Sequence, residues 1–294
     1  MFNYLHASHG AEAWGFFSPL LHAVIETLKA VPFLLIAYLF MEFWEHKSSA
    51  KMESTLAKIG KGGPLIGSVL GSVPQCGFSA TASNLYTAGI ITEGTLIAVF
   101  LATSDEAIPI LISHPEAHSS IWKIIVAKLV IGIAIGFIID IALKLFKIKK
   151  VEVDLCEDCG CEEEEGVLKP ALFHTLKTTL FILIVNVIIG YAIHFIGMDN
   201  LDKLLLSDHY AQPFITAILG LIPNCAISTA ITTLYINGSL SFGAAISGLC
   251  SGAGVGLAVL LKANPIKKEN IRIVITLYVV SALIGFSLML FGIN

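Results

Sequence analysis

Two segments far apart in the chain carry the same polar residues within apolar surroundings. Pro-Gln-Cys at 74–76 lies in the segment 64–89, and Pro-Asn-Cys at 223–225 lies in the segment 213–238. The segments align without a gap, and ten of their 26 positions are identical. A proline frees an upstream backbone carbonyl, and amides, thiols and hydroxyls can replace the water around an ion. The candidate ion-binding residues of these segments are Gln75, Cys76, Ser79, Asn224, Cys225 and Ser228.

The same residues have a purely structural alternative. Proline and glycine can simply kink a helix, and cysteine and serine are small enough to let helices approach closely. The duplication favours a site, because chance would rarely place proline, cysteine, tyrosine and glycine in one register twice.

Two adjacent carboxylates, Asp105 and Glu106, lie in the apolar stretch FLATSDEAIPILI. Carboxylates inside a membrane are costly and indicate function by default. In the second half of the chain, Gly254 stands at the position that matches Asp105, so the acidic pair occurs only once. Adjacent helical residues point about 100° apart, and we assign Asp105 as a cation ligand and Glu106 as a proton-linked group. A buried structural pair with Lys128 is the alternative. The expected metal ligands are Gln75, Cys76, Asp105, Asn224 and Cys225.

A third candidate is a cysteine-rich stretch with Cys156, Cys159 and Cys161, followed by four glutamates. This spacing is typical of a soft-metal site in a reducing compartment. Three thiols complete a four-ligand zinc site only if a carboxylate joins them. We expect an accessory cytosolic metal site here, and an acidic linker with incidental cysteines is the alternative.

The composition places all these residues in a membrane protein. Charged residues make up 14% of the chain and hydrophobic residues 55%, with a mean hydropathy of +0.82. Soluble domains carry roughly 25% charged residues, so an ordinary soluble enzyme is excluded. A net charge of −4 without a basic stripe argues against nucleic-acid binding. The sequence shows no nucleophile–base pair and no Walker-type loop, so we expect neither an enzyme nor a covalent cofactor.

The elements that must position these residues follow the duplication. Each half contains three long apolar stretches that predict membrane-spanning helices, at about 20–43, 94–112 and 121–146, and at about 172–196, 243–261 and 271–292. Half-helices of about 9–10 residues span only ~15 Å, so the segments 64–89 and 213–238 are predicted to be re-entrant hairpins with tips near the midplane. The predicted fold is all-α, with ten helical segments. Residues 1–146 form the first repeat, 147–169 a cytosolic linker, and 170–294 the second repeat.

The distribution of lysine and arginine predicts the topology. Basic residues concentrate in the loop 46–63, in the linker 147–169 and in the loop 262–272, which we place inside. The loops 113–120 and 197–211 carry almost none, which places them outside. Three crossings per half then make the two repeats inverted, with both termini outside the inner (cytoplasmic) membrane. Inverted repeats with broken helices are typical of secondary transporters.

Three stretches also resemble a known family: VPQCGFSATASNLYTAGIITEGT, FLATSDEAIPIL and IPNCAISTAITTLYINGSLS. The chain resembles the ten-transmembrane-segment heavy-metal exporters, which are related in name to arsenic-efflux permeases and often described as manganese transporters. The resemblance covers nearly the whole chain, and ten segments agree with six spans plus four half-helices. It implies export of a metal or metalloid.

The residues and the resemblance together predict a secondary transporter that exports a divalent transition metal, manganese or a similar heavy metal, with proton coupling. Oxygen ligands suit manganese, whereas thiolates suit softer metals. An arsenical permease that uses Cys76 and Cys225, and a passive ion channel, are the alternatives. The expected partners are the lipid bilayer, the metal ion and protons, without nucleic acid, and a homodimer is left open.

Overall fold

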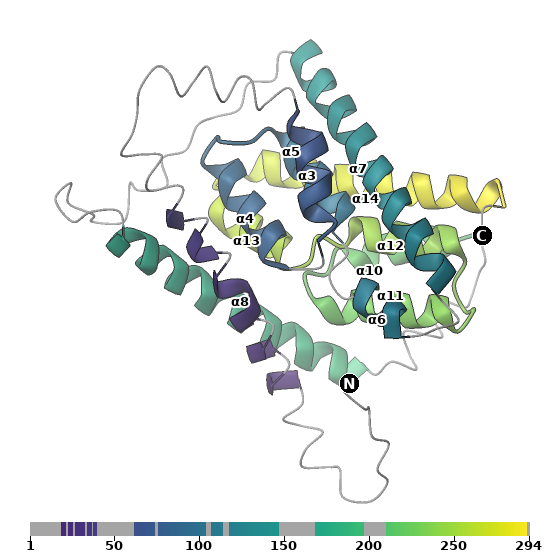
Figure 1. Ribbon diagram of the computed structural model, residues 1–294, viewed down its shortest axis with the longest axis horizontal. Coiled ribbons are helices and arrows are strands. Elements are labelled where there is room, and N and C mark those ends of the chain that lie inside the picture. Colours follow the sequence, from purple (N-terminus) through teal and green to yellow (C-terminus); the bar gives the residue numbers. More distant parts are fainter. Residues whose placement is uncertain are drawn as a thin grey trace, which may run out of the picture.

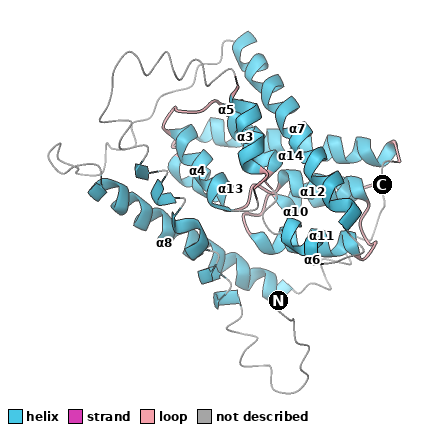
Figure 2. Cartoon of the chain, viewed as in Figure 1, coloured by secondary structure: helices cyan, strands magenta, loops and turns pink. Residues whose placement is uncertain are grey.

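The computed structural model is mostly helical in the residues that it describes. These are residues 19–39 (apart from 22, 26, 33 and 37), 62–73, 76–103, 107–113, 118–146, 168–196 and 210–292, and no strand occurs among them (Figure 2). Five helical stretches are long and apolar enough to cross a membrane: Pro19–Ile36, Ser120–Leu145, Ala171–Ile188, Phe242–Ala263 and Lys267–Leu290. The predicted all-α fold is therefore confirmed for the described part of the chain.

Two sets of three helices pack in the same way. The first set is α3 (Gly63–Gly71), α5 (Glu93–Ala102) and α7 (His118–Leu145), and the second is α10 (Gln212–Gly220), α12 (Phe242–Ser251) and α14 (Lys267–Leu290). Within each set every helix contacts the other two (Figure 1). Each helix of the second set begins 149 positions after its counterpart, the same offset that relates 64 to 213.

The shorter helices outside these sets pair across the two halves of the chain. Helix α4 (Cys76–Thr87) packs on α13 (Val255–Ala263), and α11 (Cys225–Ile236) packs on α6 (Ala107–Ser113). Each pair combines one helix from the first half of the chain with one from the second. The two halves are therefore interlocked, and they share one apolar core.

The helical segment 19–39 runs along α8 (Leu168–Ile196) (Figure 1). The hydroxyls of Tyr38 and Thr178 are hydrogen-bonded at 2.7 Å, and Asn186 Nδ2 donates to Thr27 Oγ1 at 3.4 Å. Residue numbers rise along one segment as they fall along the other, so the two are antiparallel. Together they cover α4 and α13 through a second apolar cluster, formed by Ala30, Leu34, Tyr38, Ala80, Ala171, Ile182, Val255 and Val259.

Matched capping residues begin α5 and α12. The side chain of Thr92 accepts from the backbone N–H of Thr95, and the side chain of Ser241 accepts from that of Ala244. An N-cap hydroxyl satisfies one of the backbone donors that the first helical turn leaves unpaired. The same device at the same repeat position shows why both helices start where they do.

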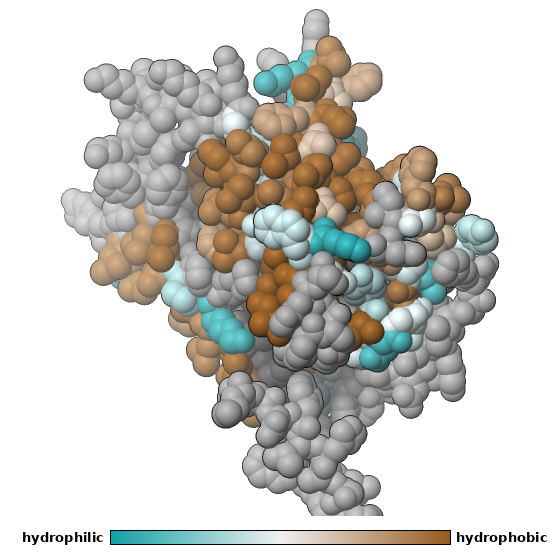
Figure 3. Space-filling model, turned by 45° about the vertical axis from the view of Figure 1, so that its right-hand side comes forward, coloured by the Kyte–Doolittle hydropathy of each residue, from teal (hydrophilic) through white to brown (hydrophobic). Residues whose placement is uncertain are grey.

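Matched glycines let the helix backbones touch. A Cβ placed on Gly94 of α5 would lie 2.2 Å from the carbonyl oxygen of Gly136 on α7, and one placed on Gly243 of α12 would lie 2.3 Å from that of Gly285 on α14. Small residues at helix contacts are a main means of tight association in membranes. The outer faces of α7 and α14 instead carry exposed apolar side chains such as Trp122, Ile138 and Ile275. Figure 3 shows extensive apolar surface on one face of the molecule.

Both predicted hairpin segments are interrupted where the sequence places proline. Helix α3 ends at Gly71 and α4 begins at Cys76, while α10 ends at Gly220 and α11 begins at Cys225. The helices predicted at 121–146, 172–196 and 271–292 are present as α7, α8 and α14 with boundaries shifted by a few residues.

The prediction of one continuous helix at 94–112 and another at 243–261 was wrong. Helix α5 ends at Ala102 and α12 ends at Ser251, and in each case a new helix begins four or five residues later. Gly254 has φ 53° and ψ −145°, a backbone conformation open mainly to glycine. The interruption after α12 was missed because glycine among small apolar residues also suits a helix contact. The one after α5 was missed because the two carboxylates were interpreted as part of a continuous apolar helix.

We expect Gly94→Ala and Gly243→Ala to destabilise the protein similarly, because each added methyl group must push one helix off its neighbour. Overpacking of this kind costs about 1–3 kcal/mol. Gly62→Ala is the matched control, since a Cβ there meets open space. Thermal unfolding in detergent measures the effect, and two variants as stable as the control would contradict these helix contacts.

Candidate functional site

Several of the predicted site residues lie outside the described part of the structure. They are Gln75, Asp105, Glu106, Cys156, Cys159 and Cys161. Cys76 and Cys225 begin α4 and α11, and only their backbone is described. Among the described residues, no three His, Cys, Asp or Glu side chains gather where they could hold a metal ion. The described members of the predicted site are Ser79, Asn224 and Ser228.

The two predicted serines contact the same interrupted helix from opposite repeats. Ser79 of α4 is fully buried against Gly256 of α13, where an added Cβ would lie 2.6 Å from the Ser79 Cβ. Ser228 of α11 lies beside Gly252, with 3.6 Å between its Oγ and an added Cβ. The stretch 252–256, which follows α12 and includes the start of α13, thus contacts both segments that the sequence duplication identified.

Polar contacts secure this junction. The hydroxyl of Ser83, one turn beyond Ser79, donates to the carbonyl oxygen of Gly256 at 2.7 Å and to that of Ser79 at 2.9 Å. Asn224 precedes α11 and is 7% exposed. These contacts give the buried Ser83 hydroxyl its hydrogen-bond partners in an apolar medium and join α4 to the first turn of α13.

A buried lysine lies between the ends of two interrupted helices. Lys128 of α7 is 1% exposed, and its ammonium donates to the carbonyl oxygens of Thr103 and Leu249. Thr103 directly follows α5, and Leu249 belongs to the last turn of α12. The sequence raised Lys128 only as an alternative partner for the acidic pair. Its position in a long apolar stretch was the signal that could have made it a primary candidate.

The helix ends give the junction a mixed electrostatic character. The carbonyl ends of α5 and α12 meet at Lys128, while the first turns of α4 and α11 contact the residues that follow α12. Helix C-termini carry partial negative charge and N-termini partial positive charge. Such ends can stabilise either sign of charge without bulk water, as in transporters built from discontinuous helices.

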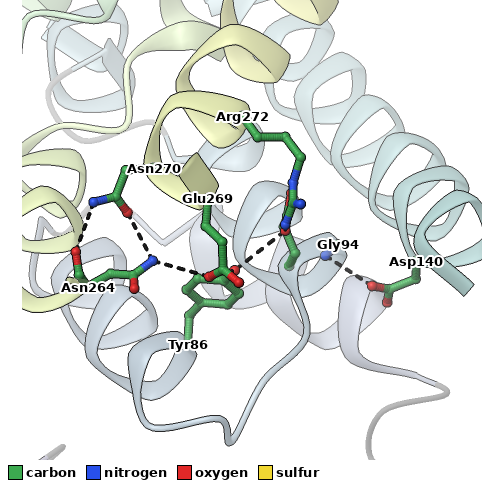
Figure 4. A network of polar contacts seen from close by, with 8 residues as sticks. Tyr86, Gly94, Asp140, Asn264, Glu269, Asn270 and Arg272 are labelled. Carbon is green, nitrogen blue, oxygen red and sulfur yellow. Dashed lines mark hydrogen bonds and ion pairs between the residues drawn. The ribbon is translucent and has the colours of Figure 1, made fainter. Parts of the chain in front are cut away.

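A second polar cluster lies away from this junction and was missed from the sequence (Figure 4). Arg272 Nε donates to Glu93 Oε1 at 2.9 Å, and its Nη2 donates to Glu93 Oε2. Tyr86 Oη donates to Glu269 Oε2 at 2.9 Å, and Asn264 Nδ2 reaches the same oxygen at 3.3 Å. Both carboxylates are 6% exposed. The cluster therefore ties α4 and α5 of the first half to α14 of the second.

The corresponding place in the other repeat lacks these two carboxylates, although Lys123 stands at the position of Arg272. Tyr235 matches Tyr86, and its hydroxyl donates to Ser120 Oγ at 3.0 Å. Ser120 stands at the repeat position of Glu269, and Phe242 stands at that of Glu93. The scaffold is thus duplicated, whereas the carboxylates are specific to one end. A single glutamate next to a helix start gives no periodic signal, which is why sequence reasoning did not find them.

An apolar cavity of about 120 Å³ lies among α3, α4 and α5. Its lining includes Ile66, Leu70, Phe78, Leu85 and Val99, and almost none of its surface is polar. A site without polar partners cannot replace the water around an ion. The cavity is therefore not the candidate transport site.

We expect Arg272→Met to lower stability by about 1.5–3 kcal/mol, the range for hydrogen bonds to charged groups, because it leaves the Glu93 carboxylate buried without its cation. The double variant Glu93→Gln/Arg272→Met should lose less than the two single losses combined. Lys268→Met, an exposed change on the same helix, is the control. Unfolding midpoints in detergent give the coupling, and strictly additive losses would show that the pair contributes nothing.

One protein-family model matches the chain over residues 16–199 and 176–292, which is most of its length. The family, ArsP_2, has the description "Putative, 10TM heavy-metal exporter". No curated protein and no solved structure matches the chain. The match agrees with the apolar helices and with the resemblance noted in the duplicated stretches. The chain belongs to this family of multi-pass membrane heavy-metal exporters.

Proposed function

We propose that the chain is a secondary transporter that exports a divalent transition metal, manganese or a similar heavy metal, from the cytosol in exchange for protons. The supporting observation is the junction at 252–256, where Ser79 and Ser228 of the two duplicated segments meet one interrupted helix. Irregular backbone at membrane depth is tolerated where it is buried in protein or lines a cavity. Segments of this kind bind substrate and coupling ions in transporters.

The repeats of this proposal are inverted in the membrane. Residues 1–146 form one repeat and 170–294 the other, with the linker 147–169 inside and both termini outside. The repeated packing of α3, α5 and α7 as α10, α12 and α14 supports the division. The antiparallel packing of 19–39 on α8, the first long helix of each half, supports the inversion.

The metal lies between the two hairpin tips in this proposal. Gln75 and Asn224 supply amide oxygens, Cys76 and Cys225 supply sulfur, and Asp105 supplies the charge that a divalent cation needs. Glu106 carries the exchanged proton. Cys156, Cys159 and Cys161 form an accessory cytosolic site that captures metal and delivers it to the tips.

One observation favours a metalloid as a second candidate substrate. The Lys128 ammonium is fixed at the junction, and its charge opposes a nearby dication unless Asp105 and Glu106 outweigh it. A neutral arsenical meets no such repulsion, and the thiols of Cys76 and Cys225 are soft ligands that suit it. Flux of Mn²⁺, Zn²⁺, Cd²⁺ and arsenite into proteoliposomes, with and without a pH gradient, separates the two candidates. Flux of none of them would contradict the proposal.

Single cysteines at positions 116, 160 and 205 test the proposed topology in an otherwise cysteine-free chain. We expect an impermeant thiol reagent applied from outside to label positions 116 and 205 and to spare position 160. An odd number of crossings in each half requires this pattern. Opposite labelling of positions 116 and 205 would show that the repeats are not inverted.

Asp105→Asn should weaken metal binding at least tenfold, because it removes a ligand charge while keeping the side-chain shape. Glu106→Gln should leave affinity within about twofold and abolish the pH dependence of flux. Calorimetry and proteoliposome flux at two pH values measure both effects. Glu116→Gln, in the expected outer loop, is the control. Wild-type affinity and wild-type pH response in both acidic variants would make the pair structural.

A further inference from the structure

Lys128 links the two halves of the protein through backbone carbonyls. Its ammonium binds the Thr103 oxygen at the end of α5 and, at 2.5 Å, the Leu249 oxygen in the last turn of α12. Position 277 of α14, its counterpart in the second repeat, is a fully buried leucine. One lysine therefore serves the carbonyl ends of helices from both repeats.

The surroundings of the ammonium have the chemistry of a cation site. The last four carbonyls of a helix lack partners within that helix, and they carry its negative dipole end. Where α12 ends, the Gly252 N–H bonds the Gly248 oxygen and the Ala253 N–H bonds the Ser251 oxygen. The Leu249 oxygen is satisfied by Lys128 instead. Carbonyl oxygens are also the ligands that hard metal cations prefer.

We propose that the Lys128 ammonium is a built-in monovalent cation, which fills a carbonyl site between α5 and α12 that would otherwise bind Na⁺. Burying a lysine inside a membrane costs free energy, and direct hydrogen bonds to two helix ends offset that cost here. If the proposed function holds, the lysine takes the place of a bound sodium ion, and metal export therefore needs no sodium. The site itself does not depend on which metal or metalloid is carried.

Three variants test the proposal without any heavy metal. Lys128→Ala empties the site, Lys128→Met fills it with an uncharged side chain of similar length, and Lys144→Ala removes an exposed lysine near the end of the same helix. Each protein is purified in sodium, and its thermal unfolding is then measured in sodium chloride and in choline chloride of equal concentration.

We expect sodium to raise the unfolding midpoint of Lys128→Ala alone, by about 2–4 °C when it is present at roughly five times its dissociation constant. The wild type, Lys128→Met and Lys144→Ala should unfold at the same temperature in both salts. A Lys128→Ala protein that ignores sodium would overturn the proposal, and so would one that fails to fold in sodium while Lys128→Met folds.

The wild-type protein decides the matter if neither Lys128 variant folds. Equal unfolding midpoints in the two salts, and metal or arsenite flux that a sodium gradient does not change, support the proposal. A sodium-raised midpoint or sodium-driven flux overturns it. If no tested substrate is transported, the proposed function fails. The sodium effect on the unfolding of Lys128→Ala still tests the cation site, because that measurement involves no transported substrate.

Discussion

Interrupted helices inside a membrane expose backbone groups that must find partners within the protein, and this requirement organises the rest of the structure. A free carbonyl or N–H in hydrocarbon costs several kcal/mol. The interruption between α12 and α13 is packed against α4 and α7 of the other half. Lys128 satisfies carbonyls at the ends of α5 and α12, and the Ser83 hydroxyl bonds the Gly256 carbonyl to join α4 to α13. The interlocking of the halves and their close contacts at glycine follow from the same need, because partners must come near enough to bond.

Part of this arrangement could be predicted from the sequence, because the duplicated segments carry prolines that fix where their helices stop. The interruption before Gly254 could not be predicted, since a glycine among small apolar residues is equally typical of a close contact between continuous helices. The cluster of Glu93, Glu269 and Arg272 was also not predicted, because Glu93 lies nearly 180 positions from the other two and meets them only through the packing of α5 on α14. Ser79 and Ser228 were predicted as site residues because each one is the other's counterpart in the repeat.

The two halves share a scaffold and differ in charge. At the equivalent positions of the other repeat, Lys128 is replaced by a leucine, Glu93 by a phenylalanine and Glu269 by a serine. The helices that carry these residues nevertheless pack in the same pattern. A duplicated framework supplies two sets of helix ends, and single charged residues then make the two sides of the junction chemically distinct.

The central claim is that the substrate binds where the duplicated segments meet the interruption between α12 and α13. The most direct test is a crystal structure of the protein loaded with Cd²⁺, in which anomalous scattering locates the ion without reference to any assumed ligand. Cd²⁺ accepts both sulfur and oxygen ligands, so it reports on the tips under either candidate substrate. The account predicts an anomalous peak at the junction, within bonding distance of Cys76 or Cys225. Peaks confined to the cysteines of the 147–169 linker, with none at the junction, would contradict it.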